Sequence, residues 1–294
     1  MTRIVVPVDP SFRFDLALRY LQRSPDEIID LVRDGRHHRV ITGAGSLALI
    51  AISLSNPGLL EVRLLAGSAG PERIEEAVRG LYPLADQPIE HIHDEPLAVR
   101  LHDSFLGLPV VQTLTPWEAL VWAILGQQIN IAFAYRLKRA FVERFGDRIA
   151  FADEIYFGFP DPERVANLDH ERDLLPLQFS RQKSRYIIEA ARSVLRGDLD
   201  FAAISDMGDA SASIALQRQL GVGRWTAEYI LLRGYSRLDV IPAGDAALKM
   251  AVGQQLDLGR SATEDEVRQL AERWRPWRGQ TAFMLWFAKQ AGWF

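Results

Sequence analysis

The spacing of apolar residues divides the 294-residue chain into two differently patterned parts. In the first part, runs of β-branched and apolar residues at 39–53 and 60–66 predict strands. A periodic segment at 71–82 predicts a helix, and a capping-box pattern at 24–27 predicts the start of another. We therefore expect residues 1–105 to form an α+β domain with a small antiparallel sheet.

The second part is patterned as helices. Thr115, Pro116 and Glu118 form a helix-start signal, in which Thr caps, Pro begins the first turn and Glu reaches back to the cap. We find no strand pattern of comparable strength after this point, so residues 106–294 are expected to be helical. Apolar residues recur at three- and four-residue spacing in the segments 116–125, 129–145, 181–196, 210–220, 224–233, 246–256, 263–273 and 279–291.

Composition excludes several classes of site. The chain has no cysteine, so it can hold no disulfide, zinc finger, iron–sulfur cluster or cysteine nucleophile. The first residues, MTRIVVPVDP, resemble neither a signal peptide nor a membrane span. We therefore expect a soluble, cytoplasmic protein that does not contact membranes. A net charge of −4 and an isoelectric point near 5.9 argue mildly against a nucleic acid partner.

Positive charge is nevertheless concentrated locally. Segment 181–197 carries five Lys or Arg residues against Glu189, and segment 216–238 carries four Arg residues against Glu228. Charged runs of this kind are usually solvated helix faces, but they could also face phosphate groups. The pattern alone leaves both interpretations open.

The segment 216–234, LQRQLGVGRWTAEYILLRG, places two glycines between two amphipathic helices. Gly221 and Gly223 permit a very short turn and leave no side chain in the way of an approaching surface. The second helix then begins beside Gly223 with its free N–H groups facing outward, which is a favourable phosphate site. The alternative is a simple αα-hairpin that binds nothing.

Several motifs in order resemble those of a known family. LGVGRWTA at 220–227, LRG at 232–234 and DVIPAGD at 239–245 resemble the helix-hairpin-helix motif and trailing aspartate of base-excision DNA glycosylases, the HhH-GPD superfamily. The likeness is greatest to the AlkA-type, 3-methyladenine DNA glycosylase II branch. It extends to AILGQQ at 123–128, ERWRPWR at 272–278, and Trp286. Leu220 departs from the proline that the family often has before the first hairpin glycine.

This resemblance implies a fold and an activity. The fold is mostly α, with a two-lobed helix-hairpin-helix core over 106–294, the hairpin at 214–234, and an N-terminal α+β domain. The activity is that of a base-excision repair enzyme that flips alkylated bases, such as 3-methyladenine and 7-methylguanine, out of duplex DNA and excises them. The expected partner is double-stranded DNA containing such bases, bound by a monomer; in a bacterium the protein would associate with the nucleoid.

Asp245 is the residue on which the resemblance places the chemistry. It lies after Gly244 and before an apolar helical segment, so it is an N-cap candidate, and most such aspartates only cap. Backbone donors and a helix dipole favour the charged form of a capping carboxylate. Such a fixed charge can stabilise an oxocarbenium-like state and orient water. Asp239 is the fallback candidate.

Trp225 indicates the type of reaction. In related enzymes that also cut the DNA backbone, the matching position holds a lysine that forms a Schiff base, which tryptophan cannot do. The resemblance therefore implies a monofunctional, hydrolytic enzyme. The absence of cysteine excludes the cluster-bearing branch of the superfamily.

Aromatic residues are the candidates for the base pocket. The resemblance assigns Trp286 as the main stacking ring, with Trp225 and Tyr229 beside it, and we add Tyr20 as a fourth candidate. An N-alkylated purine is positively charged, so an electron-rich ring attracts it more than a normal base. Ala246 stands where the family often has another aromatic. The tryptophans assigned to the core by default are Trp117, Trp122, Trp274, Trp277 and Trp293.

The remaining site candidates concern DNA and an ion. Gln128, followed by Ile129, matches the position of the wedge that fills the space left by a flipped base, although a turn between two helices is the simpler interpretation. No cofactor is expected, and main-chain carbonyls of Gln217, Gln219 and Val222 are candidates to hold a sodium or potassium ion. The hairpin candidates for DNA contact are Gly221, Val222, Gly223, Arg224 and Thr226.

Two alternatives remain open at this stage. One is an enzyme of the same superfamily that acts on another lesion, such as an oxidised purine. The other is a non-catalytic helix-hairpin-helix protein that binds damaged DNA.

Overall fold

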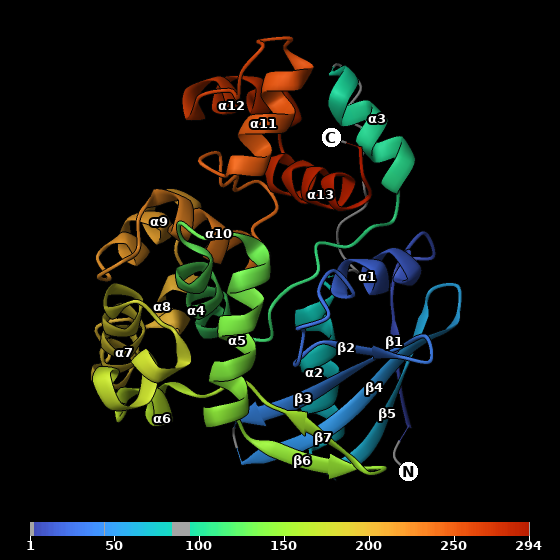
Figure 1. The fold of residues 1–294 in the computed structure, drawn as a ribbon. Coiled ribbons are helices and arrows are strands. Elements are labelled where there is room, and N and C mark those ends of the chain that lie inside the picture. Colours follow the sequence, from blue (N-terminus) through green and yellow to red (C-terminus); the bar gives the residue numbers. More distant parts are fainter. Residues whose placement is uncertain (1–2, 44, 84–94, 294) are drawn as a thin grey trace.

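The computed structural model describes residues 3–43, 45–83 and 95–293, and its elements form three groups (Figure 1). The N-terminal part of the chain forms a sheet with two helices. A second group contains the helices between residues 116 and 234. The third group contains the last helices together with α3 (Pro96–Phe105), a segment that is distant from them in sequence.

The five-stranded sheet is antiparallel throughout, with the strand order β1-β5-β4-β3-β2. Apolar residues of one face, among them Ile50 and Val62, pack against helices α1 (Phe14–Leu21) and α2 (Pro71–Leu81). The predicted N-terminal α+β unit with a small sheet is therefore confirmed. The strands are β1 (Arg3–Pro7), β2 (Leu31–Arg33), β3 (Arg36–Gly43), β4 (Ser46–Asn56) and β5 (Leu59–Ser68).

The other face of this sheet is covered by a β-hairpin from the second part of the chain, formed by β6 (Arg148–Phe151) and β7 (Glu154–Phe157). The expectation that no strand follows residue 115 was wrong here. Tyr156 packs on the sheet beside Val40 and Leu49, so the hairpin shields apolar side chains from water. Its turn, Ala152-Asp153, has positive φ angles without the Asn-Gly signal that usually predicts them.

The helix predicted to begin at 24–27 was also wrong, because these residues form a turn. The Glu27 carboxylate does not reach back to Ser24, as a capping box requires. It accepts the N–H groups of Ile28 and Ile29, both at 2.9 Å, and the ammonium of Lys138 at 2.7 Å. The buried lysine on a distant helix thus outweighs the local capping signal.

The predicted helices after residue 115 are confirmed to within a few residues, and the Thr115 hydroxyl accepts the N–H of Glu118 at 3.2 Å as expected. Helices α4 and α10 are buried almost all round and pack against each other in the middle of the second group. The helices of this group are α4 (Pro116–Gly126), α5 (Ile131–Phe145), α6 (Pro162–Ala166), α7 (Arg181–Arg196), α8 (Phe201–Ser205), α9 (Asp209–Gln217) and α10 (Arg224–Gly234), with a π turn (His170–Leu174) and a 3₁₀ turn (Leu175–Leu177).

The third group brings α3 together with the C-terminal helices. Phe105 of α3 lies 5.0 Å from Phe287 of the last helix, ring centre to ring centre. One hydrophobic cluster runs from the sheet through α3 to the last helices, so the division into domains at residue 105 stays a prediction. The remaining elements are α11 (Ala246–Gln255), α12 (Glu264–Ala271), the 3₁₀ turn Glu272–Trp274 and α13 (Arg278–Gln290).

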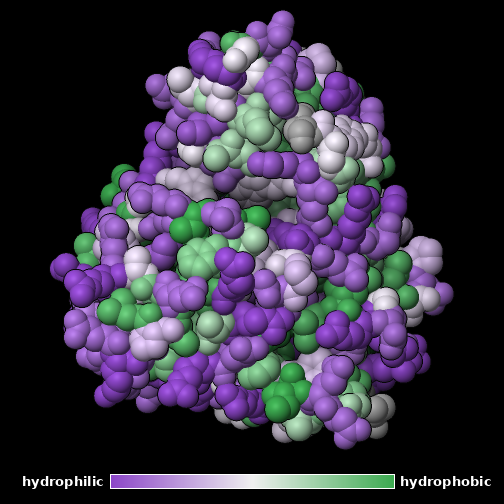
Figure 2. Space-filling model, viewed as in Figure 1, coloured by the Kyte–Doolittle hydropathy of each residue, from purple (hydrophilic) through white to green (hydrophobic). Residues whose placement is uncertain are grey.

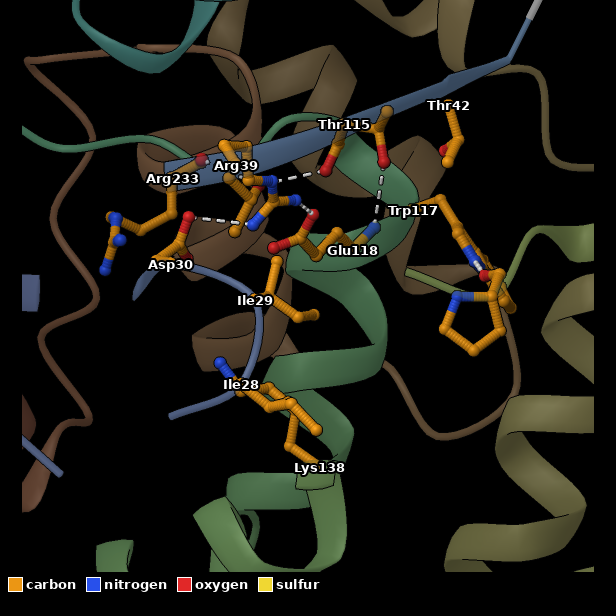
Figure 3. Close-up of polar contacts among 12 residues, drawn as sticks. Ile28, Ile29, Asp30, Arg39, Thr42, Thr115, Trp117, Glu118, Lys138 and Arg233 are labelled. Carbon is orange, nitrogen blue, oxygen red and sulfur yellow. Dashed lines mark hydrogen bonds and ion pairs between the residues drawn. The ribbon is translucent and has the colours of Figure 1, made fainter. Parts of the chain in front are cut away.

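Buried ionic contacts hold the sheet against the second group. Arg39 of β3, 1% exposed, donates to Asp30 at 2.8 Å and to Glu118 of α4 (Figure 3). Although burial opposes ionisation, Arg39 lowers the pKa of Asp30 well below its usual value, so the carboxylate stays charged. The contacts fix α4 against the sheet.

The tryptophans assigned to the core are mostly there. Trp117, Trp122 and Trp274 are buried, and Trp277 is half-buried. Trp293 was assigned wrongly: it is 39% exposed and packs on the surface, with its ring 5.0 Å from that of Phe105. No helix in the described ranges is long and apolar enough to cross a membrane.

Candidate active site

The Asp245 carboxylate is held by three donors, all of which reach the same oxygen. As the N-cap of α11, its Oδ1 accepts the N–H of Ala247 at 2.8 Å and that of Leu248 at 3.1 Å. The indole Nε1 of Trp286 donates to the same oxygen at 3.0 Å. Among the described residues nothing donates to Oδ2. The site therefore presents a fixed, half-buried carboxylate with one free oxygen.

Asp239, the fallback candidate, is held quite differently. Its Oδ1 accepts Nε of Arg278 at 2.9 Å, and its Oδ2 accepts Nη1 of Arg275 at 2.7 Å. Both oxygens are thus occupied by arginine side chains, which leaves no lone carboxylate oxygen for a substrate. The geometry favours Asp245 over Asp239 as the reactive group.

Three of the four predicted pocket aromatics form a row beside Asp245. The ring of Trp286, on α13, lies 5.9 Å from that of Tyr229, which lies 5.7 Å from that of Trp225. Tyr229 and Trp225 are one turn apart on α10, so they project from the same face. Tyr229 is buried, whereas both tryptophans are half-buried. The half-buried rings leave aromatic surface available to a ligand.

Tyr20 lies behind this row. Its ring is 4.5 Å from that of Phe283, which in turn contacts Trp286 at 6.4 Å. Its hydroxyl accepts a hydrogen bond from Arg233 at 2.6 Å. Because Tyr20 is only 2% exposed, it supports the pocket from within.

Two further residues of this region were not among the pocket candidates predicted from the sequence. Trp122 and Tyr135, whose rings are 4.8 Å apart, belong to the same apolar cluster as Tyr229. A cavity of about 30 Å³ lies among Tyr20, Arg23 and these rings. Helix α4 is buried almost all round, so periodicity could not show that the core residue Trp122 also borders a cavity.

The structure gives the two hairpin glycines different roles. Gly221 has φ +86°, and a Cβ there would lie 2.3 Å from the ring of Tyr186. Gly223 is exposed, has φ −88°, and a Cβ there would meet nothing within 4 Å. Gly221 is therefore required for packing, whereas Gly223 keeps the surface at the start of α10 free of side chains.

The first turn of α10 offers backbone donors to that surface. The N–H groups of Arg224, Trp225 and Thr226 precede the first intrahelical bond, which runs from Ala227 to Gly223 at 2.9 Å. The side chains of Val222 and Thr226 are buried, so these two candidates can reach a ligand only through their backbones.

Arg224, with its side chain 57% exposed, is partly neutralised by acidic neighbours. Its Nε donates to Glu228 at 3.2 Å, and Nη1 lies 3.7 Å from Glu264. It remains a candidate for contact with an anion, but with a weaker positive field than a free arginine would give.

The loop between α4 and α5 is tied to the hairpin. The side chain of Gln127 donates to the carbonyl of Gly221 at 2.9 Å and to the hydroxyl of Thr226 at 3.1 Å. Gln128 follows with φ +57° and an exposed side chain, while Ile129 is half-buried against the core. Of the two wedge candidates, Gln128 is therefore the one that projects.

Lys183 holds this loop from the other side. Its ammonium donates to the carbonyls of Ile124, Leu125 and Gln127 at 2.9, 2.5 and 2.7 Å, closing the C-terminal end of α4. Burial lowers the pKa of Lys183 to about 8. The cationic run at 181–197 is thus not one surface: Lys183 is internal.

Two arginines of that run remain candidates for phosphate contact. Arg181 and Arg185 are exposed, and neither forms an ion pair within the described part of the chain. Arg185 precedes Tyr186, the residue packed against Gly221, so it lies next to the hairpin.

Replacing Lys183 by methionine is expected to lower the free energy of unfolding by about 1 to 3 kcal/mol, because the carbonyls of Ile124, Leu125 and Gln127 lose the ammonium as a donor. Urea denaturation of the variant and the parent protein measures this. Arg181→Met, at an exposed position two residues away, is the control and should leave stability unchanged. Equal stability of the Lys183→Met and parent proteins would contradict the assigned role.

The candidate ion ligands are neutral carbonyl oxygens at the hairpin turn. That of Gln219 accepts the N–H of Val222 at 3.0 Å, whereas the carbonyls of Gln217 and Val222 accept no hydrogen bond from the described residues. Uncommitted carbonyls at a tight turn suit a sodium or potassium ion. Within residues 3–43, 45–83 and 95–293, no cluster of three His, Cys, Asp or Glu side chains is able to hold a metal.

The elements that carry Asp245 and Trp286 lie above a hollow in the molecular surface. Figure 2 shows this hollow between the α11–α13 group at the top and the two groups below it. The hairpin helix α10, which carries Tyr229, runs beside it (Figure 1). The elements that carry the carboxylate and the aromatic row thus border this hollow.

The chain is similar to several known proteins. Residues 121–276 match the model of the HhH-GPD superfamily base excision DNA repair protein. A DNA-3-methyladenine glycosylase of Bacillus subtilis is 32% identical over 291 residues, covering 96% of both chains. DNA-3-methyladenine glycosylase 2 of Escherichia coli is 32% identical over 194 residues, covering 66% of this chain and 64% of the relative.

A solved structure has the same fold over nearly its full length. The 3-methyladenine DNA-glycosylase from Archaeoglobus fulgidus superposes with a TM-score of 0.83 at 23% identity, covering 99% of both chains. The predicted fold class, a helical core with an N-terminal sheet domain, is confirmed.

Proposed function

Because the chain belongs to the HhH-GPD superfamily of base excision DNA repair proteins, we propose that it is a monofunctional DNA glycosylase that excises alkylated bases from duplex DNA. We propose that it acts as a monomer and takes bases such as 3-methyladenine and 7-methylguanine. One observation carries this proposal: a carboxylate fixed by three donors lies at the end of a row of aromatic rings.

Asp245 supplies a fixed negative charge beside the sugar. Loss of the base leaves positive charge on the deoxyribose, and a preorganised carboxylate stabilises that charge without having to reorganise. With Oδ1 occupied by three donors, Oδ2 is the oxygen that faces the sugar or orients the attacking water. The reaction then needs only water and this carboxylate, with no cofactor.

Trp286 connects base binding to the carboxylate. Its ring stacks against the flipped base together with Tyr229 and Trp225, while its N–H fixes Asp245. An N-alkylated purine is a cation and a good leaving group, so stacking on these rings favours it over a normal base by about 0.5 to 2 kcal/mol.

The hairpin holds the DNA backbone. The free N–H groups at the start of α10 bind a phosphate, for which Gly223 leaves room, and Arg181 and Arg185 add positive charge nearby. Gln128 projects from the loop tied to this hairpin and fills the gap left in the duplex. An alkali ion held by Gln217, Gln219 and Val222 would add positive charge to the same phosphate site.

The alternative of a superfamily enzyme for another lesion, such as an oxidised purine, is less favoured for the lyase-type members. Trp225 packs beside Tyr229, and the hairpin position that holds a lysine in such enzymes offers no amine here. The other alternative, a non-catalytic protein that binds damaged DNA, does not explain why the Asp245 carboxylate is fixed by Trp286 beside the aromatic rings.

A duplex labelled on one strand and carrying a single 7-methylguanine tests this function. The protein should create an abasic site, which a separate abasic-site endonuclease then cleaves, while the strand stays intact with the protein alone. Strand cleavage by the protein alone would indicate a lyase, and a strand that stays intact even with the endonuclease would overturn the glycosylase assignment for this lesion.

Replacing Trp286 by phenylalanine should slow single-turnover excision about tenfold or more, because the ring remains but the charge-assisted hydrogen bond to Asp245 is lost. Trp293→Phe, at the exposed surface tryptophan, is the matched control and should excise at the parent rate. An unchanged rate for Trp286→Phe would show that the indole N–H does not position the carboxylate.

A further inference from the structure

Two guanidinium groups lie around the cavity below the aromatic row. Arg233 is 4% exposed and donates to the carbonyl of Val111 and to the hydroxyl of Tyr20, both at 2.6 Å. Arg23 has its Cζ 4.0 Å from the centre of the Tyr20 ring, and its Nε donates to the hydroxyl of Tyr135. Neither arginine forms an ion pair within residues 3–43, 45–83 and 95–293.

The nearby carboxylates are already paired with other cations. Glu27 binds the ammonium of Lys138 at 2.7 Å, while Asp30 and Glu118 bind Arg39. The inner end of the pocket therefore has an excess of positive charge that no described side chain neutralises. In agreement, burial opposes ionisation of Tyr20, but Arg23 and Arg233 outweigh it and lower the pKa of its hydroxyl.

The two arginines differ in how many donors remain free. Arg233 uses both Nε and Nη1 within the protein. Arg23 has two hydrogen-bond partners among the described residues, the hydroxyls of Tyr135 and Tyr20, so some of its five N–H groups remain available. Its side chain is half-buried and borders the cavity together with Trp122 and Tyr229. The remaining donors are therefore available to a ligand in the cavity.

A flipped base can supply that acceptor. Tyr229 contacts Trp286 at 5.9 Å on one side and borders the cavity on the other. A base whose sugar lies at Asp245 and whose face lies on these rings would then bring its far edge to the cavity that Arg23 borders. Guanine derivatives present the O6 acceptor on their edge, whereas adenine derivatives present an N6 amino donor. A guanidinium has donors only, so at the position of the C6 substituent it pairs with O6 and faces the N6 amino group unpaired.

We propose that Arg23 is a specificity-determining residue, which donates to the carbonyl edge of the flipped base and favours guanine-derived over adenine-derived lesions. This inference rests on the proposed glycosylase function. It refines the expectation drawn from the cationic character of the base, because 7-methylguanine and 3-methyladenine in DNA are both cations and differ in this edge. The charge of the base therefore cannot distinguish 7-methylguanine from 3-methyladenine, but an arginine donor at the edge of the base can.

The test measures both bases in one reaction. Duplex DNA treated with a methylating agent contains 7-methylguanine and 3-methyladenine, and chromatography of the released bases gives the two rates under single-turnover conditions. Arg23→Met keeps an apolar stem over Tyr20 but removes the donors. We expect it to lower the rate for 7-methylguanine relative to that for 3-methyladenine by about tenfold, and Arg23→Lys to lower it less.

A control variant separates recognition from the loss of a positive charge. Arg19→Met changes an exposed arginine of α1, the helix that ends two residues before Arg23. It should leave the ratio of the two rates as in the parent protein. An equal loss of both rates in Arg23→Met, an unchanged ratio, or the same ratio change in Arg19→Met would overturn the proposal. If the parent protein releases neither base, the glycosylase function itself has failed.

Discussion

The Asp245→Asn protein is expected to bind lesion-containing duplex DNA as tightly as the parent but to excise bases at least about a hundredfold more slowly. The amide has the shape of the carboxylate and can still accept the N–H groups of Ala247 and Leu248, so α11 keeps its cap. What is lost is the negative charge beside the sugar. Single-turnover excision at saturating protein, with affinity measured separately, distinguishes the two effects.

Asp239→Asn is the matched control for this experiment. It removes the charge of the other candidate aspartate, which is bound by Arg275 and Arg278 at the surface. Its excision rate at saturation should equal that of the parent protein. If instead Asp239→Asn lost excision and Asp245→Asn kept it, the assignment of the reactive carboxylate would be reversed.

Valine is expected to have different effects at the two hairpin glycines: it should weaken DNA binding at Gly223 and lower stability at Gly221. Gly223→Val should weaken binding to every DNA sequence by about tenfold or more, because a branched side chain stands in front of the backbone donors of α10. Thermal stability and the excision rate at saturation should stay near those of the parent. Gly221→Val should instead destabilise the fold, since its φ is +86° and the new side chain would overlap the ring of Tyr186.

Fluorescence anisotropy with labelled duplex and thermal melting measure the two effects. Gly208→Val is a suitable control, because Gly208 also caps a helix in open space but at the end of α9 away from the hairpin. It should change neither quantity. Loss of affinity in Gly208→Val equal to that in Gly223→Val would show that the hairpin is not the specific contact.

Local sequence patterns were sufficient to predict residues whose hydrogen-bond partners lie in the same segment of the chain. The Asp245 N-cap and the Thr115 cap depend on backbone groups within a few residues, so sequence order predicts them. The helix boundaries followed from apolar periodicity for the same reason. In each case the side chain and its partner are close neighbours along the chain.

The inner part of the pocket could not be predicted this way. Lys183 and Arg233 look like members of cationic helix faces in the sequence, yet each is buried against groups from other elements. Arg23 reaches Tyr135 across 112 positions. A pairing across such separations leaves no periodic signal. The β6–β7 hairpin escaped prediction because its partner is the distant face of the sheet.

Release of free methylated base from methylated duplex DNA tests the central claim most directly. After incubation with the parent protein, chromatography of the soluble fraction should show intact 3-methyladenine or 7-methylguanine, with the DNA strands uncut, and the Asp245→Asn protein should release neither. If the parent protein binds the methylated duplex but no methylated base appears in solution, the glycosylase account is contradicted and the protein is a damaged-DNA-binding protein instead.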